Sequence, residues 1–226
     1  MLRISVKENK KKDNIYFEAK KLLLSKGFKN TTIQQIATNA GVPKALVMYY
    51  YKKEDFVSLI YIDFINAIRK RIEDTVGNKL GNAFQLQLIT TRIFFNIIFN
   101  SDSYKNLYKE ILFNQLLPIN SPAHEIVRKP LILLVEEFDI NISEEVFELA
   151  LEAEFGGILR LMRTRFDKLN PKISAPFIYF ISTISARLIE IPGSIINDNV
   201  SRSEELLKEI DYYDIPFIDL NEDASS

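Results

Sequence analysis

The sequence has 226 residues, 47% of them hydrophobic, so it can bury a core without covalent cross-links. It contains no cysteine, which excludes disulfide bonds and thiolate metal sites. Residues 1–54 hold 12 Lys and Arg against 4 Asp and Glu, whereas the remainder holds 17 against 26, so a basic first part precedes an acidic second part. Only the basic part suits a polyanion such as nucleic acid, unless its charges form a merely solvated face.

Neither a secretory signal nor a membrane span is expected. The first residues are basic and lack an apolar run ahead of a small-residue cleavage site. The two most apolar stretches, 89–99 and 177–191, each contain Arg and are shorter than the roughly 20 residues that a membrane span needs. We therefore expect a soluble, cytoplasmic protein.

The first two predicted helices are bounded by glycines. The first ends at Gly27, which is well placed as a left-handed cap, and Phe28 folds back onto its last turn. Its apolar face consists of Ile15, Ala19, Leu22 and Leu23. The short second helix begins at the capping hydroxyls of Thr31 and Thr32 and ends at Gly41. Its inner face consists of Ile33, Ile36, Ala37 and Ala40.

A third short helix opens at Pro43 and extends to about Tyr50, and a longer helix follows over 54–76. Clusters of Asn, Ser, Pro and Asp separate the later predicted helices, which cover about 84–100, 103–117, 123–138, 143–166 and 175–191. No segment alternates convincingly as a strand would. The acidic end, 211–226, contains Pro216 and is predicted to be an extended or loosely ordered tail. The expected fold class is all-α.

Residues 31–51 have the pattern of a helix-turn-helix. Ala37 allows two helices to approach closely, and Gly41 can supply the positive φ of a tight turn between them. Val42 and Val47 close a small core with the Ile33/Ile36 pair. The alternative interpretation, an ordinary helical corner, requires neither this turn chemistry nor the basic surroundings.

The residues left outside this core are unusual for a solvent-exposed surface and suit a DNA major groove. They are Lys44, Ala45, Leu46, Met48 and Tyr49. Ala45 or Leu46 can receive thymine methyl groups, while Tyr49 and Lys44 can reach base edges or phosphates. Flanking positions expected to contact phosphates at two helix N-termini are Thr31, Thr32, Lys52 and Lys53.

These residues resemble the N-terminal signature of TetR-type transcriptional regulators over about residues 15–56. The matching residues are Thr31-Thr32-Ile33, Ile36-Ala37, Ala40-Gly41-Val42, Tyr50-Tyr51 and Lys53-Glu54. The resemblance implies a DNA-binding domain of three helices, 1–53, and a larger helical effector-binding and dimerisation domain, 54–210, followed by the acidic tail. It also implies a homodimer that represses transcription until a small molecule binds. Because one reading helix discriminates poorly, a palindromic operator is expected.

The sequence departs from the family pattern at four places. Pro43 stands where a capping Ser is frequent, Ala45 where Gly is usual, and Met48 where a Tyr that contacts phosphate is common. The segment after Tyr51 is one residue short. Met48 offers no hydroxyl for that phosphate contact, which the neighbouring Tyr49 could supply instead.

Small residues in the predicted helix over 143–166 suggest a close helix contact. Gly156 and Gly157 each cost about 1 kcal/mol relative to Ala inside a helix, so a contact should offset them. The expected dimer interface, placed by the family resemblance on the last two long helices, includes Ala153, Gly157, Phe177, Ile181, Ile184 and Leu188. The alternative is a kink over a ligand cavity.

Aromatic residues gather in the middle helices. Most suit an ordinary core, yet an apolar or aromatic effector would need such a lining, for which we name Phe94, Phe99, Tyr104, Tyr108, Phe113 and Phe155. Arg92 and Glu154 lie in apolar surroundings and either orient a polar ligand group or are paired or solvated, the second interpretation being favoured.

Catalytic chemistry has little support in the sequence. The one histidine, His124, has no second His or Cys with which to bind a metal, and no glycine-rich phosphate loop is present. We expect no enzyme activity, no cofactor and no metal. The expected partners are double-stranded operator DNA, a small-molecule effector and a second copy of the chain. The alternative is a helical small-molecule or lipid-binding protein whose basic part binds another anionic surface.

Overall fold

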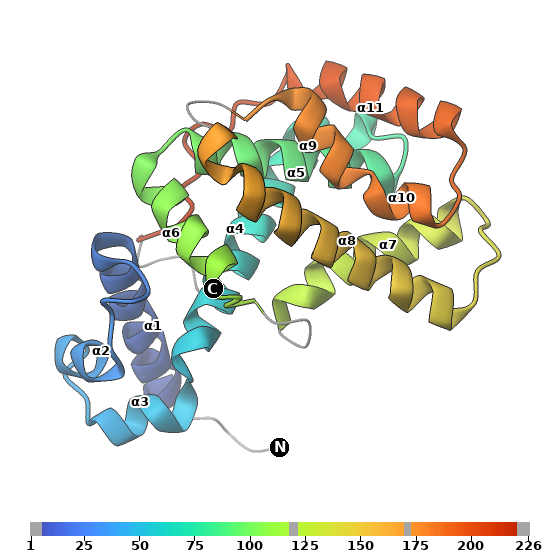
Figure 1. The fold of residues 1–226 in the computed structure, drawn as a ribbon. Helices are drawn as coiled ribbons and strands as arrows, with labels where there is room; N and C mark the ends of the chain where they lie inside the picture. Colours follow the sequence, from blue (N-terminus) through green and yellow to red (C-terminus); the bar gives the residue numbers. More distant parts are fainter. Residues whose placement is uncertain (1–5, 118–121, 170–172, 221–226) are drawn as a thin grey trace.

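The computed structural model describes residues 6–117, 122–169 and 173–220, and these residues confirm the all-α fold class. The helices are α1 (Val6–Lys26), α2 (Ile33–Asn39), α3 (Lys44–Tyr50), α4 (Lys53–Val76), α5 (Ala83–Phe99), α6 (Asp102–Phe113), α7 (Pro122–Glu137), α8 (Glu144–Arg165), α9 (Ala175–Ser182), α10 (Ile184–Leu188) and α11 (Gly193–Leu207), with 3-10 turns at Gly77–Lys79 and Phe166–Leu169. Figure 1 shows α1, α2 and α3 at one end of the molecule and α4 running from them into the other helices. We call residues 6–52 the head and residues 53–220 the body.

The head folds around a small closed core, as its residue pattern predicts. Ile36 and Val47 are fully buried where α2 and α3 cross. The turn between these helices places Gly41 at φ +65°, a left-handed conformation that other residues adopt at a cost. The Asn14 side chain on α1 donates a hydrogen bond of 2.9 Å to the Ala40 carbonyl, which fixes α1 against this turn.

Polar contacts join α1 and the loop after it to the body. The Tyr16 hydroxyl donates to the Asp63 carboxylate on α4 at 2.7 Å. After α1, Gly27 has φ +76°, and the next backbone N–H, that of Phe28, donates to the Glu110 carboxylate on α6 at 2.6 Å. The left-handed cap expected at Gly27 is confirmed, and it presents a backbone donor to the body.

The last helices differ from the prediction. The expected helix over 175–191 is divided at Thr183 into α9 and α10, and α11 follows where the sequence analysis assigned no helix. The inner face of α11 consists of Ile196, Asn199, Ser203 and Leu206. These positions have helical spacing, but Asn199 and Ser203 are polar, so a hydrophobicity pattern does not show it. The Asn199 amide donates to the Ile195 carbonyl within α11, and its oxygen accepts from Asn82, the residue before α5, at 2.7 Å.

The expectation of a loosely ordered tail over 211–226 is wrong for residues 211–220. Phe217 is 1% exposed and lies with its ring centroid 5.0 Å from that of Phe64 on α4 and 5.6 Å from that of Tyr104 on α6. The Arg71 guanidinium on α4 binds both oxygens of the Asp214 carboxylate at 2.8 and 2.9 Å. This segment therefore packs on the body, and residues 221–226 lie outside the described part of the chain.

Candidate DNA-binding surface and ligand cavity

The outer face of α3 is exposed, as the helix-turn-helix prediction requires. Tyr49 is 78% and Met48 62% exposed, whereas the preceding residue, Val47, is fully buried. Lys44 and Ala45 at the start of the same helix are exposed, and Leu46 is half-buried. The helix thus presents one cation, one phenol and three apolar side chains on a single face.

Two of the four predicted flanking residues lie beside this surface in exposed positions. Thr32 caps α2 by accepting the Gln35 backbone N–H at 3.2 Å, while Gln35 returns a side-chain acceptor to the Thr32 N–H at 2.9 Å. The side chain of Lys52 is exposed, and its backbone N–H donates to Asp55 at 2.7 Å, which fixes the start of α4.

The other two flanking residues have inward contacts. Thr31 is fully buried and its hydroxyl donates to the Gly27 carbonyl at 2.8 Å, so the expected contact between its side chain and phosphate is wrong. The Lys53 ammonium lies 3.9 Å from the centre of the Phe28 ring, and burial lowers the pKa of Lys53. Thr31 therefore stabilises the head from within, and Lys53 packs the start of α4 on it. The sequence does not reveal these contacts, because each residue is adjacent to an exposed residue of the same type, Thr32 or Lys52.

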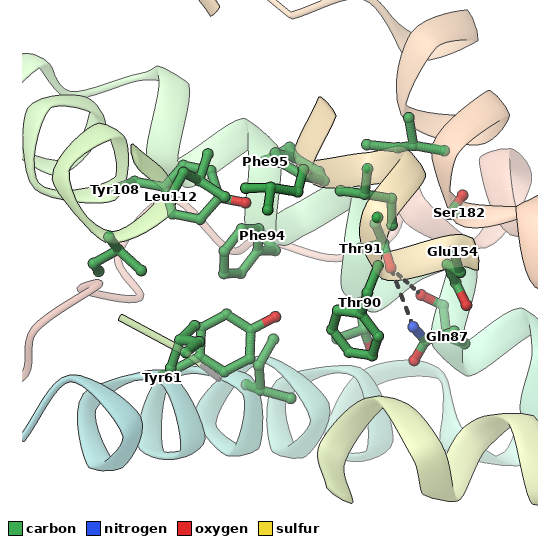
Figure 2. Close-up of a pocket in the computed structure, with 18 of the residues that line it drawn as sticks. Tyr61, Gln87, Thr90, Thr91, Phe94, Phe95, Tyr108, Leu112, Glu154 and Ser182 are labelled. Carbon is green, nitrogen blue, oxygen red and sulfur yellow. Dashed lines mark hydrogen bonds between the residues drawn. The ribbon is translucent and has the colours of Figure 1, made fainter. Parts of the chain in front are cut away.

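The body contains a cavity of about 560 Å³ lined by residues of α4, α5, α6, α8 and α9. The aromatic residues that line it are Tyr61, Phe94, Phe95, Tyr108 and Phe155. The polar residues that line it include Arg69, Gln87, Thr91, Glu154 and Ser182. Figure 2 shows this division, with Tyr61, Phe94 and Tyr108 on one side and the hydrogen-bonded Gln87 and Thr91 near Glu154 on the other.

The structure places the six aromatic residues proposed for this lining in two groups. Phe94, Tyr108 and Phe155 line the cavity. The other three do not: Phe99 packs on Phe166, Tyr104 packs on Phe217, and Phe113 lies on the surface with 41% of its side chain exposed. The sequence analysis did not name Tyr61 and Phe95 for this lining. Tyr61 lies one helical turn before Ile65 on α4, and Phe95 lies one turn after Thr91 on α5. That these faces line one cavity follows only from the packing of α4 on α5.

The two charged candidates also separate. Glu154 is 6% exposed and lines the cavity, and burial raises its pKa to about 7 although the Ser185 hydroxyl hydrogen-bonds to it. Arg92 lies outside the cavity lining, with its Nε 3.8 Å from the Glu204 carboxylate on α11. The paired interpretation therefore describes Arg92, whereas Glu154 faces ligand space.

Some of the residues predicted for a dimer interface are buried within the protomer, and others are exposed on its surface. Ile181 is fully buried within the protomer, and an added Cβ at Gly157 would lie 3.8 Å from Ile184, so these residues pack inside one chain. Ala153 and Leu188 are exposed, the latter by 44%. Phe177 is half-buried against the core. The expectation of Ile181 as a surface contact is wrong, because its side chain is buried within the protomer, and of the small residues on α8 it is Gly157 that meets α10.

Metal sites and helices able to cross a membrane are absent from the part of the chain that the structure describes. It holds no group of three or more His, Cys, Asp and Glu side chains that could bind a metal ion. His124 falls among residues whose side chains the structure does not describe. No helix within the same residues is long and apolar enough to cross a membrane.

The arrangement defines the class of protein: an all-α chain that joins an exposed helix-turn-helix to a helical body with an internal cavity. Residues 15–57 match the family described as bacterial regulatory proteins, tetR family. This match covers the segment over 15–56 whose residues resemble the same family. No curated protein matches the chain.

Two solved structures are similar to the whole fold. RolR without ligand superposes with a TM-score of 0.54 at 12% identity, covering 83% of this chain and 95% of RolR. RolR in complex with resorcinol superposes with a TM-score of 0.52 at 14% identity, covering 87% of this chain and 95% of RolR. At these identities the likeness establishes the fold alone, and it extends through the body as well as the head.

Proposed function

We propose that this protein is a ligand-responsive transcriptional repressor that binds a palindromic operator as a homodimer and is released by a small, largely apolar or aromatic effector. The observation that carries the proposal is the outer face of α3, where Tyr49 and Met48 are exposed above a closed core. A soluble head gains nothing from exposing a phenol and a thioether together, unless a partner covers them. A major groove offers the thymine methyls and hydrogen-bonding edges that this face would meet.

The electrostatics of the head support a DNA partner. Exposed cations on α1 and around the turn include Lys10, Lys11, Lys26 and Lys29. Lys44 on α3 and Lys52 before α4 add two more exposed cations at or near the outer face of α3. Because neutralised phosphates release counterions, each such contact adds affinity that falls as salt rises.

An apolar stripe on α8 supports the proposed homodimer. Val146, Leu149, Ala153 and Gly156 recur at helical spacing and are all exposed, with Leu149 56% exposed. Phe180 on α9 and Leu188 on α10 are 54% and 44% exposed. A twofold axis through this surface would bury the same residues from both copies. Such a dimer would also place the two α3 helices about 34 Å apart, so that each can enter one of two successive major grooves.

Two helices provide the proposed coupling between effector and operator. α4 begins at the head and carries Tyr61 and Ile65 into the cavity wall. α6 carries Tyr108 and Ile111 into the same wall, while Glu110 between them accepts the Phe28 N–H of the head. An effector that moves either wall would therefore shift the head, weaken DNA binding and be weakened by DNA in equal measure. The resorcinol bound to RolR, a protein of similar fold, makes hydroxyaromatic compounds suitable first probes.

The test of DNA recognition is selection of duplexes from a random-sequence pool, followed by titration of the selected site. We expect a palindromic site, an affinity that falls steeply with salt, and a loss of about tenfold or more in Tyr49→Ala. Lys44→Ala should weaken binding and lower the salt slope by about 1. Tyr213→Ala is the matched control, because Tyr213 is a 67% exposed tyrosine in the C-terminal segment.

Equal binding to all duplexes would contradict the repressor and favour the alternative, a helical carrier with a basic head. The carrier predicts binding to vesicles of anionic lipid with no preference among DNA sequences. The homodimer is tested separately by sedimentation of Leu149→Glu, which should be monomeric. Met48→Glu, also exposed but in the head, should stay dimeric, and an unchanged dimer in Leu149→Glu would exclude the α8 interface.

A further inference from the structure

The polar end of the cavity has a composition that packing alone does not require. Glu154 and Ser182 are each 6% exposed and, with Gln87, form part of the wall between the main cavity and a small void of about 20 Å³. Leu131 and Leu134 close the far side of that void. An apolar residue at position 154 would suit these neighbours, so the carboxyl group needs a separate explanation.

No neighbouring charge accounts for Glu154. Among the described residues no basic side chain lies within ion-pair distance of it, and its one hydrogen bond comes from the neutral Ser185 hydroxyl. A carboxylate has about four acceptor sites, and this single donor occupies only one of them. A buried carboxylate with a single neutral donor is costly, and a ligand donor arriving through the cavity would offset that cost.

The rest of the cavity restricts what the ligand can be. Tyr61 and Phe94 meet edge to face with ring centroids 5.6 Å apart, and Phe94 and Tyr108 likewise at 5.4 Å, so the wall opposite Glu154 offers aromatic faces and edges. The guanidinium of Arg69 lines the same space. A cationic ligand would add a second positive charge beside it, whereas a neutral donor would not.

We propose that the effector is a neutral hydroxyaromatic compound whose hydroxyl group donates a hydrogen bond to Glu154 while its ring packs on the wall of Tyr61, Phe94 and Tyr108. This rests on the proposed function, in which the cavity takes the effector. Glu154 is then the residue that selects a hydroxyl over its methyl ether. Gln87 and Ser182 at the same end position further polar groups.

The test is calorimetric titration of the full chain with pairs of neutral aromatics that differ only in the donor: phenol and anisole, resorcinol and 1,3-dimethoxybenzene, 1-naphthol and 1-methoxynaphthalene. Above about pH 7, where the Glu154 carboxyl is ionised, loss of a hydrogen bond to a charged group predicts at least about tenfold weaker binding of each ether. Glu154→Gln should weaken binding of the hydroxyl compounds by a similar factor and reduce the preference. Glu145→Gln is the control, because Glu145 is exposed on the same helix, α8, and lies outside the cavity lining.

Four outcomes overturn the inference. They are equal binding of hydroxyl and ether in the wild-type protein, unchanged resorcinol binding in a folded Glu154→Gln, tighter binding of benzylammonium than of any hydroxyl compound, and no binding of any pair. If Glu154→Gln does not fold, the hydroxyl and ether pairs on the wild-type protein still decide. Operator binding is measured on the same samples: intact operator binding with any of these four outcomes leaves the DNA-binding function standing, whereas its absence counts against the proposed function itself.

Discussion

The head and the body place their polar chemistry on opposite sides of their cores. In the head, Tyr49 and Lys44 lie outside a core closed by Val47, so their side chains are free to meet a partner larger than the domain. In the body, Glu154 is buried and faces an internal cavity of about 560 Å³, which suits a partner small enough to be enclosed.

This difference has a consequence for substitutions. An exposed side chain on α3 contributes little to the free energy of unfolding, so its replacement should change binding and leave stability unaltered. A buried side chain around the cavity contributes to both quantities. Binding and stability should therefore vary independently on the outer face of the head and together in the body.

The largest effect is expected at Phe217, which makes the C-terminal segment part of the body core. Phe217→Ala removes a side chain that is 1% exposed and should lower the free energy of unfolding by about 3–5 kcal/mol in urea titration. Tyr213→Ala, four residues earlier and 67% exposed, should change it by less than about 0.5 kcal/mol. Equal changes in the free energy of unfolding for the two variants would contradict the packing of this segment on the body.

A pH-dependent effect is expected at Glu154. Burial raises its pKa from the ordinary 4.5 to about 7, so between these values the folded state holds a proton that the unfolded state releases. Stability therefore falls as pH rises through this window, and the loss is complete above about pH 7. Glu154→Gln cannot ionise and should be the more stable protein at alkaline pH, by up to about 3 kcal/mol.

Thermal unfolding of both proteins across this pH window measures the effect. The difference should vanish below the ordinary pKa of the carboxyl, where both side chains are neutral. A difference that stays constant with pH would show that Glu154 ionises as freely in the folded protein as in the unfolded chain.

A smaller effect is expected at the turn of the head. Gly41→Ala places a Cβ in open space but at φ +65°, so it should cost about 1–2 kcal/mol from the backbone alone. Gly77→Ala, at φ −53°, should instead stabilise the protein by up to about 1 kcal/mol. Chemical denaturation of the two variants compares them directly, and the same sign for both would contradict the left-handed turn.

The smallest effect distinguishes two adjacent threonines of the head. Thr31→Val removes a buried hydrogen bond to Gly27 and should lower stability by about 1 kcal/mol while leaving operator affinity unchanged. Thr32→Ala removes an exposed cap beside the reading face and should lower both quantities. Operator titration and denaturation of each variant are the measurements. Weaker operator binding in a fully folded Thr31→Val would restore Thr31 to the DNA contacts.

Prediction from the sequence succeeded where a structural feature depends on neighbouring residues. The caps at Gly27 and Thr32, and the turn at Gly41, were identified correctly because a left-handed φ or a capping hydroxyl leaves a sign within a few positions. α11 was missed because its buried face carries the polar residues Asn199 and Ser203, and the partners of Asn199 on another element and within the helix itself leave no sign in a hydrophobicity pattern.

The sequence by itself determined the all-α fold class and the helix-turn-helix, because a helix-turn-helix is a local unit whose core, turn and outer face lie within some twenty residues. The tertiary structure alone decided which aromatic residues surround the cavity, why Glu154 faces it and Arg92 does not, and that the C-terminal segment packs on α4. Each of these depends on contacts between helices far apart in the chain. Helical periodicity shows which residues point inward, but not which neighbours they meet there.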